Sequence, residues 1–178
     1  MPGRGNRRIA QCCGPAIVRH GAGLFLAARR CVGAPPSKNP PAATMTTPIT
    51  WQDSHALGQA EMDSIHQGFV ELLARAQSAA DAELGAAMEA LYSHTQSHFA
   101  RETELMTATA LSSRKEHEGD HARVLGEMDQ MRARAVKGRV AFVRGYVNEV
   151  LPGWLHTHLM TMDAELANAC KRAGIGAA

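Results

Sequence analysis

Two pairs of polar residues in this 178-residue chain have a spacing that suits metal binding. His98 and Glu102 lie four positions apart in HFARE, and His117 and His121 do so in HEGDH. Residues four apart on a helix differ by only about 40° around its axis, so both side chains of a pair can point at one object. Either pair alone is also typical of a solvated helix face, so the metal interpretation depends on further residues.

Three further residues extend the candidate set. His66 lies beside apolar residues in MDSIH, and WLHTHLMTMD contains His158 and Asp163. The five-residue step from His158 to Asp163 corresponds to about 140° around a helix, which the geometry of a single face does not favour. Burying all these groups without partners would nevertheless cost several kcal/mol each, and a metal removes that cost. The candidate ligands are therefore His66, His98, Glu102, His117, His121, His158 and Asp163.

Four amphipathic segments carry these residues. Apolar residues recur every three or four positions from about Gly58 onward, which predicts helices over residues 59–79, 82–108, 113–135 and 140–171. Four helices of this length with short connections are best buried as a bundle. The sequence thus predicts an all-α fold, an up-down-up-down four-helix bundle with a disordered N-terminal extension.

Specific residues mark where these helices should begin or bend. Asp81 is expected to cap the second helix. SRKE, from Ser113 to Glu116, has the spacing of a capping box and should open the third helix. Pro152 lacks a backbone donor and crowds the preceding turn, so we predict a kink or a restart near Leu151.

Residues 1–44 differ in composition from the rest of the chain. They contain seven Lys or Arg and no Asp or Glu, and they end in the proline-rich GAPPSKNPPAAT. X-Pro steps without periodicity favour disorder. We expect either a transit-like leader or sequence upstream of a true start at Met45, and we prefer the second. The bundle should occupy residues 45–178.

The composition after residue 44 argues against several classes of partner. Twelve basic residues are scattered among seventeen acidic ones, so no basic stripe indicates nucleic-acid binding. The apolar stretch at 21–28 is far shorter than the ~20 residues that span a bilayer. Cys170 is the single cysteine after residue 44, which is consistent with a reducing compartment. We therefore expect a cytoplasmic protein that binds neither nucleic acid nor membrane.

In order and spacing, these motifs resemble those of the hemerythrins, in particular the small bacterial hemerythrins. The resemblance begins at Trp51 and includes D..H, HF..E, H...H and WL..H....D, ending at Asp163. It fills all seven ligand positions, including the five-residue step. It implies a bundle around two non-haem iron ions, bridged by carboxylates and by an oxo or hydroxo group.

The resemblance also implies a role for each candidate. One iron would be bound by His117, His121 and His158. The other would be bound by His66 and His98. Both irons would be bridged by Glu102 and Asp163. The iron with two imidazoles would keep an open coordination position for dioxygen.

Other residues match the surroundings of the family's centre. The apolar residues that would line the dioxygen pocket are Phe69, Phe99, Trp154 and Leu155. Two histidines fall outside the ligand set. We expect His156 to face solvent, and His94 to lie at the surface or behind the ligands.

The implied function is reversible dioxygen binding by a non-haem diiron protein that carries, stores or supplies dioxygen. A sensor of dioxygen or iron and an enzyme reducing peroxide or nitric oxide are the alternatives within the family. No cluster-binding or nucleotide-binding motif indicates an electron supply, so we expect no enzymatic activity. A ferritin-like oxidase built on Asp63–His66 and Glu118–His121 would leave three histidines without a role. A metal-free helical interaction module is a further class.

Overall fold

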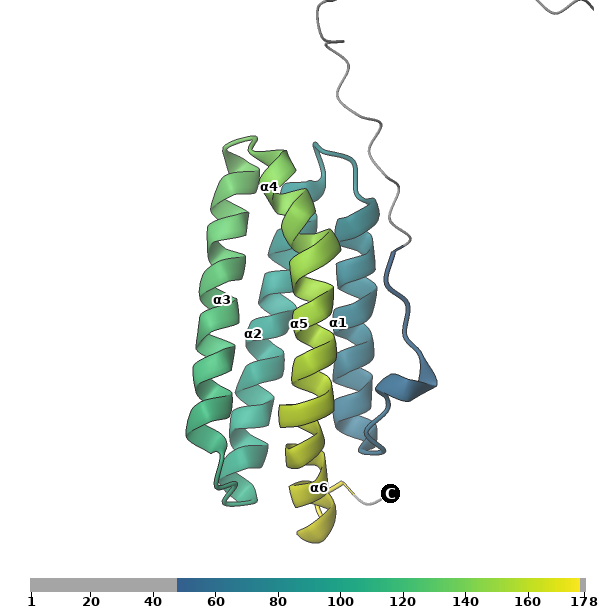
Figure 1. The fold of residues 1–178 in the computed structure, drawn as a ribbon, viewed down its shortest axis with the longest axis vertical. Coiled ribbons are helices and arrows are strands. Elements are labelled where there is room, and N and C mark those ends of the chain that lie inside the picture. The colour runs from purple at the N-terminus through teal and green to yellow at the C-terminus, as the bar shows by residue number, and fades with distance from the viewer. Residues whose placement is uncertain (1–47, 177–178) are drawn as a thin grey trace, which may run out of the picture. The chain divides into compact units, whose positions relative to one another are not determined.

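The computed structural model describes residues 48–176, and every regular element among them is helical. Four antiparallel rods lie side by side (Figure 1). The first three are α1 (Ala60–Ser78), α2 (Leu84–Ala108) and α3 (Arg114–Val136). The fourth consists of α4 (Val140–Gly145), η2 (Tyr146–Val150), α5 (Leu151–His158), η3 (Leu159–Asp163) and α6 (Ala164–Arg172). The predicted all-α, up-down-up-down bundle is confirmed.

The predicted helix ends agree with the structure to within two residues. A short 3-10 turn, η1 (Asp53–His55), precedes the first rod. In the described part of the chain, no helix is both long and apolar enough to cross a bilayer. The expected leader over residues 1–44 lies outside the described residues and stays a prediction, as does the start at Met45.

Asp63 fixes the beginning of α1. Its carboxylate accepts hydrogen bonds from the backbone N–H groups of Leu57 at 2.7 Å, Gly58 at 3.0 Å and Gln59 at 3.2 Å. Gly58 has a φ of 69°, a left-handed conformation that glycine adopts without a steric cost. The negative charge also suits the positive end of the helix dipole.

Two predicted caps are wrong in detail. Glu83, not Asp81, precedes α2, and Asp81 instead forms an ion pair with Arg144 on the fourth rod at 2.9 Å. Ser113 does precede α3, but its hydroxyl donates to Glu165 at 2.7 Å and makes no capping bond. In both cases the side chain that was expected to cap a helix forms a contact with another rod instead.

The fourth rod restarts where Pro152 predicts. The π-helical turn η2 ends at Val150, α5 begins at Leu151, and Pro152 lies in the first turn of α5. A proline is tolerated in a first helical turn, where its missing N–H would have no partner in any case. The second π-helical turn, η3, was not predicted.

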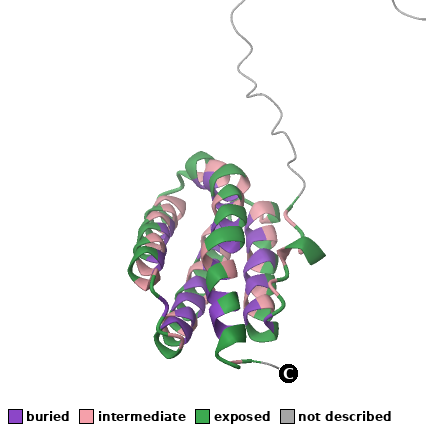
Figure 2. Ribbon diagram, turned by 60° about the horizontal axis from the view of Figure 1, so that its bottom comes forward, coloured by how far each residue is buried: buried purple, intermediate pink, exposed green. Residues whose placement is uncertain are grey.

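Figure 2 shows where buried residues lie along the rods. The apolar ones form two clusters. The larger cluster, which we call the upper cluster, includes Phe69, Leu91, Val124 and Leu155. The smaller, lower cluster is centred on Met62, Leu105, Met106, Leu111, Leu166 and Cys170. On α1, α2 and the fourth rod the candidate ligands lie between residues of the two clusters. Those of α3 lie between Leu111, just before the helix, and Val124, so the bundle encloses a polar layer between apolar ones.

Candidate metal centre

The seven candidate ligands meet inside the bundle, and each is 4% exposed or less. They come from all four rods: His66 from α1, His98 and Glu102 from α2, His117 and His121 from α3, and His158 and Asp163 from the ends of α5 and η3. Their ligand atoms fall into two compact groups, within each of which all atoms lie within 4.8 Å of one another. The structure thus brings together every residue of the predicted set.

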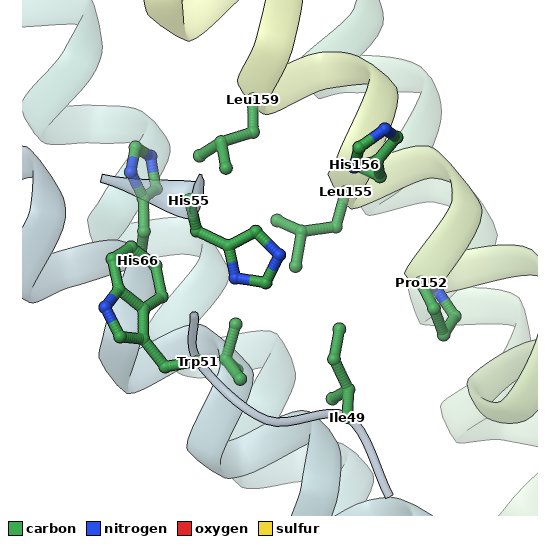
Figure 3. A pocket seen from close by; sticks show the side chains of 9 residues that line it. Ile49, Trp51, His55, His66, Pro152, Leu155, His156 and Leu159 are labelled. Atoms are coloured by element: carbon green, nitrogen blue, oxygen red, sulfur yellow. The ribbon is translucent and has the colours of Figure 1, made fainter. Parts of the chain in front are cut away.

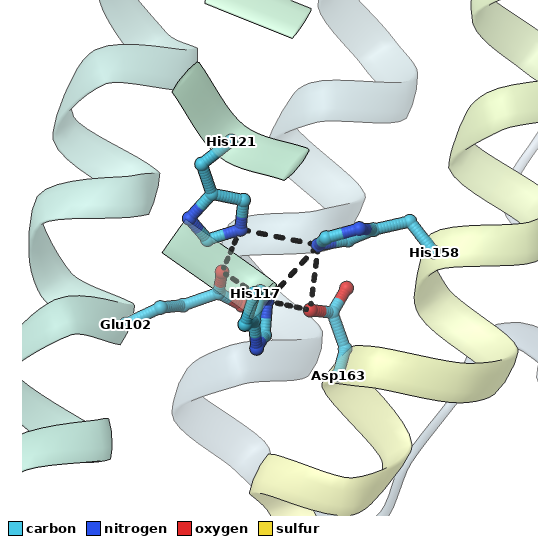
Figure 4. A group of neighbouring side chains, drawn as sticks. All are labelled: Glu102, His117, His121, His158 and Asp163. Atoms are coloured by element: carbon cyan, nitrogen blue, oxygen red, sulfur yellow. Dashed lines mark hydrogen bonds and ion pairs between the residues drawn. The ribbon is translucent and has the colours of Figure 1, made fainter. Parts of the chain in front are cut away.

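The first group contains three imidazoles (Figure 4). The Nε2 atom of His158 lies 3.0 Å from Nε2 of His117 and 3.1 Å from Nε2 of His121. A neutral imidazole carries one N–H, so three converging nitrogens cannot satisfy one another by hydrogen bonding alone. A single cation that accepts one lone pair from each imidazole would satisfy all three nitrogens.

The two carboxylates connect this group with the second. Glu102 places Oε2 at 3.1 Å from His121 Nε2, and Oε1 at 3.1 Å from His98 Nε2. Asp163 places Oδ1 at 3.2 Å from Nε2 of His158 and Oδ2 at 3.3 Å from Nε2 of His66. Each carboxylate therefore offers one oxygen to each group, which is the arrangement needed to bridge two cations.

The two groups are unequal. Three imidazoles and two carboxylate oxygens face the first metal position. Two imidazoles and two carboxylate oxygens face the second. The nearby His94 does not join them, because its Nε2 contacts the carbonyl oxygen of Ile65. The side chains thus supply five ligand atoms at one position and four at the other.

The chemistry of the enclosed atoms fits a pair of cations. Among the described residues, the buried atoms without a hydrogen-bond partner include Nε2 of His66, Nε2 of His98 and all four oxygens of Glu102 and Asp163. Buried polar atoms nearly always have a hydrogen-bond partner, so six neighbouring atoms without one require an explanation. Nitrogen-rich sites with carboxylates suit iron and other first-row metals.

The carboxylates are charged despite their burial. Burial raises the pKa of Glu102, but the charge of His98 and the close imidazoles of His121 and His66 outweigh it and hold the pKa well below its ordinary value. Burial likewise lowers the pKa of His66, yet Asp163 and Glu102 outweigh it and raise that pKa to about 9. The buried acids and imidazoles thus carry opposite charges at the place where cations would bind.

The π-helical turn η3 explains the five-residue step between His158 and Asp163. In a π-helix the hydrogen bond joins residues five apart, so these two side chains lie one above the other. Regular α-helical geometry would have turned Asp163 away from the cluster. Single π-helical turns are frequent at functional sites.

Asp120 is a neighbour of the cluster that the sequence analysis missed. Its Oδ2 accepts hydrogen bonds from Nδ1 of His158 at 2.9 Å and from Nε1 of Trp154 at 2.7 Å. The only hint in the sequence was that an acid directly precedes His121. The partners of this acid lie on another rod, so spacing along the chain could not identify them.

Aromatic rings cover the cluster on one side. Phe99 stacks on His121 with ring centroids 3.6 Å apart, and Trp154 stacks on His158 at 4.8 Å. Phe69 lies 6.2 Å from Trp154 and 6.5 Å from His98. These three residues, which were predicted to line a dioxygen pocket, lie against the ligands, and their role in binding dioxygen stays a prediction.

A small cavity lies on another side, against His66 (Figure 3). Of the predicted pocket residues only Leu155 lines it; the other lining residues are Ile49, Trp51, His55, His66, Val70, Pro152, His156 and Leu159. Its volume is about 20 Å³, which is enough for one water-sized molecule. Sequence reasoning missed the residues from the segment before α1, because that segment shows no helical period.

His94 and His156, which the sequence leaves outside the ligand set, are outside both ligand groups. His94 is half-buried, and its Nε2 lies 3.0 Å from the carbonyl oxygen of Ile65. His156 is exposed at the mouth of the cavity. Both positions agree with the expectation for these residues.

The ferritin-like alternative is not supported by the geometry. Asp63, one of its proposed ligands, instead binds backbone N–H groups at the start of α1. Glu118, the other, accepts a hydrogen bond from Arg114 at 2.8 Å. Neither carboxylate belongs to the two ligand groups.

Comparisons with known proteins agree with the geometry. A model of the Hemerythrin HHE cation binding domain matches residues 57–170. A bacteriohemerythrin from Ralstonia nicotianae is 35% identical over 115 residues, which is 65% of this chain and 83% of that protein. A myohemerythrin from Riftia pachyptila is 30% identical over 118 residues, 66% of this chain and 89% of that protein. No solved structure matches the chain significantly.

The matched residues include all seven candidate ligands. Two groups of histidines joined by two carboxylates are what a carboxylate-bridged diiron centre requires. This chain therefore belongs to the hemerythrin family of diiron, dioxygen-binding proteins.

Proposed function

We propose that this chain binds dioxygen reversibly at two iron ions held by the seven buried ligands, and that it carries, stores or supplies dioxygen. The observation that carries the proposal is the unequal division of ligand atoms, five against four. When bound, the iron pair supplies electrons to dioxygen and takes them back on release. The position with fewer protein ligands, beside His66 and His98, is where a small molecule would bind.

The surroundings of His66 favour release over reaction. The wall of the adjoining cavity is mostly apolar, with Val70, Leu155 and Leu159 among its residues. Apolar walls offer no hydrogen bonds to water, so a reduced ligand there would be poorly solvated. Poor solvation suppresses the loss of a charged, reduced form of dioxygen, and so supports reversible binding.

The segment before α1 covers this cavity. Trp51 is half-buried and meets the ring of His55 edge to face, with centroids 5.4 Å apart. Ile49 is held by a hydrogen bond from its N–H to the side chain of Gln77 at 2.7 Å. These contacts place two large apolar side chains between solvent and His66.

The main test uses the full chain loaded with ferrous iron without air. We expect two irons per chain and a visible absorption band that appears with dioxygen and disappears when dioxygen is removed, over repeated cycles. Rapid irreversible oxidation, with peroxide or nitric oxide consumed, would instead favour the enzyme. A chain that keeps no iron would overturn the proposal.

A variant tests the role of the covering segment. Trp51→Ala should open the cavity to water and accelerate irreversible oxidation at least several-fold, while the iron content stays unchanged. Tyr92→Ala is a matched control, because Tyr92 is also a half-buried aromatic residue but does not line the cavity. Equal oxidation rates in the two variants would argue against a protective role for Trp51.

Histidines at the cavity favour one second candidate. His55 and His156 both line it, and imidazoles are effective proton donors. A proton supply would suit an enzyme that reduces peroxide or nitric oxide.

A cytoplasmic location and the lack of nucleic-acid or membrane partners stay predictions.

A further inference from the structure

Asp120 joins the metal centre to the protein surface. The residue lies on α3, and its side chain is 19% exposed. One oxygen, Oδ2, accepts from His158 at 2.9 Å and from Trp154 at 2.7 Å. The other oxygen, Oδ1, accepts from Arg123, at 2.7 Å from Nη2 and 3.0 Å from Nε. One oxygen of Asp120 thus faces the candidate ligand, and the other faces a cation at the surface.

The contact with His158 determines the form of that imidazole. Since a carboxylate only accepts hydrogen bonds, Nδ1 of His158 carries the proton and Nε2 presents a lone pair to the three-histidine position. Nδ1 of the other four ligand histidines is buried without a hydrogen-bond partner in the described part of the chain. Among the described residues, His158 is therefore the ligand histidine whose Nδ1 has an anionic partner.

We infer that Asp120 is a positioning residue that sets how strongly His158 donates to its metal, and that Arg123 moderates this effect from the surface. The inference rests on the proposed assignment of His158 as a ligand. A carboxylate that shares the Nδ1 proton makes the imidazole more basic at Nε2. A more basic ligand stabilises ferric over ferrous iron.

Arg123 and Trp154 act on the same carboxylate. Both donate hydrogen bonds to it, which draws charge away from the bond to His158. Removal of Arg123 should therefore leave more negative charge for His158.

The sign of this coupling distinguishes tuning from simple support. Asp120→Asn removes the anion, so the reduction potential of the iron pair should rise and iron loss to a chelator should accelerate about 10- to 100-fold. Arg123→Met keeps the aliphatic stem but removes the cation, so the potential should fall. If Asp120 only supported the fold, both variants would shift the potential in the same direction.

The experiment uses the full chain loaded with iron. Asp129→Asn is the matched control, because Asp129 is an exposed acid on the same helix that pairs with Arg132 at 3.0 Å. Asp120→Glu should restore most of the iron retention. The inference is overturned if Asp120→Asn behaves like Asp129→Asn, or if Arg123→Met raises the potential.

A metal-free measurement separates this inference from the proposed function. In a Trp51→Phe background, Trp154 is the remaining tryptophan of the chain. Asp120→Asn should shift its fluorescence emission, because the indole N–H loses a charged acceptor, while Asp129→Asn should not. An unchanged emission would contradict the contact between Trp154 and Asp120. A wild-type chain that retains no iron after loading would instead contradict the proposed function.

Discussion

At the scale of single residues, Glu102 and Asp163 decide that the centre holds a pair of cations. Each places one carboxylate oxygen near the first group of histidines and the other near the second. Five histidines without these acids would give two unconnected nitrogen sites with excess positive charge. The bridging acids both join the positions and balance the charge.

Glu102→Gln should reduce iron from two per chain to at most one. The amide keeps the size of the side chain but loses the charge, and its NH₂ group would point at one of the two positions. Iron can be counted after gel filtration. Glu104→Gln is the control, since Glu104 lies on the same helix but is exposed and pairs with Arg101. Retention of two irons by Glu102→Gln would refute the bridging role.

At the scale of elements, η3 gives the fourth rod its ligand geometry. Five residues fill this turn where four would fill an α-helical turn. The rod can therefore continue in its former direction into α6, while His158 and Asp163 face the same interior point. The extra residue is accommodated on the outside, where Met160 is 50% exposed.

Deletion of Met160 tests this account. The shortened turn should become α-helical, and the two ligands, now four apart, should still share a face, so iron binding should persist. Insertion of one alanine after Met160 makes the step six residues and should abolish binding. Circular dichroism would confirm folding, and iron counts would decide. The reverse pattern would show that η3 does not align the ligands.

The sequence predicted some elements better than others, for physical reasons. The His98–Glu102 and His117–His121 pairs follow from α-helical geometry, which repeats along the chain. The alignment of His158 with Asp163 depends on a π-helical turn, for which no local signal was read. Asp81 and Ser113 were misassigned because contacts between rods outcompeted local caps. Asp120 was missed for the same reason.

At the scale of the whole molecule, the ligands connect all four rods at one level. The upper and lower clusters pack above and below them. A metal pair therefore ties the four rods together between two apolar layers. Its removal leaves buried polar atoms without partners, at a cost of about 1–3 kcal/mol each.

Removal of iron by a chelator should lower the melting temperature by roughly 10 °C or more, since 1 kcal/mol corresponds to about 2–4 °C for a chain of this size. The metal-free protein should also lose stability as pH rises from about 6.5 through about 9. The reason is that the pKa of His66 is raised on folding, so its protonated form stabilises the fold below this range. Thermal scans at several pH values would measure both effects.

The loaded protein provides the control, because metal displaces the protons from the cluster. Its melting temperature should vary less over the same pH range. Equal pH profiles with and without iron would mean that His66 does not hold a proton in the metal-free state.

The packing on both sides of the ligands also affects how ions arrive. Each ligand is 4% exposed or less, so an ion reaches the enclosed layer most readily while the rods are apart, and that state is rare once the chain has folded. We therefore expect newly made chains to capture their ions during folding and to exchange them slowly afterwards. The identity of the bound metal would then record which ions surrounded the chain at its synthesis.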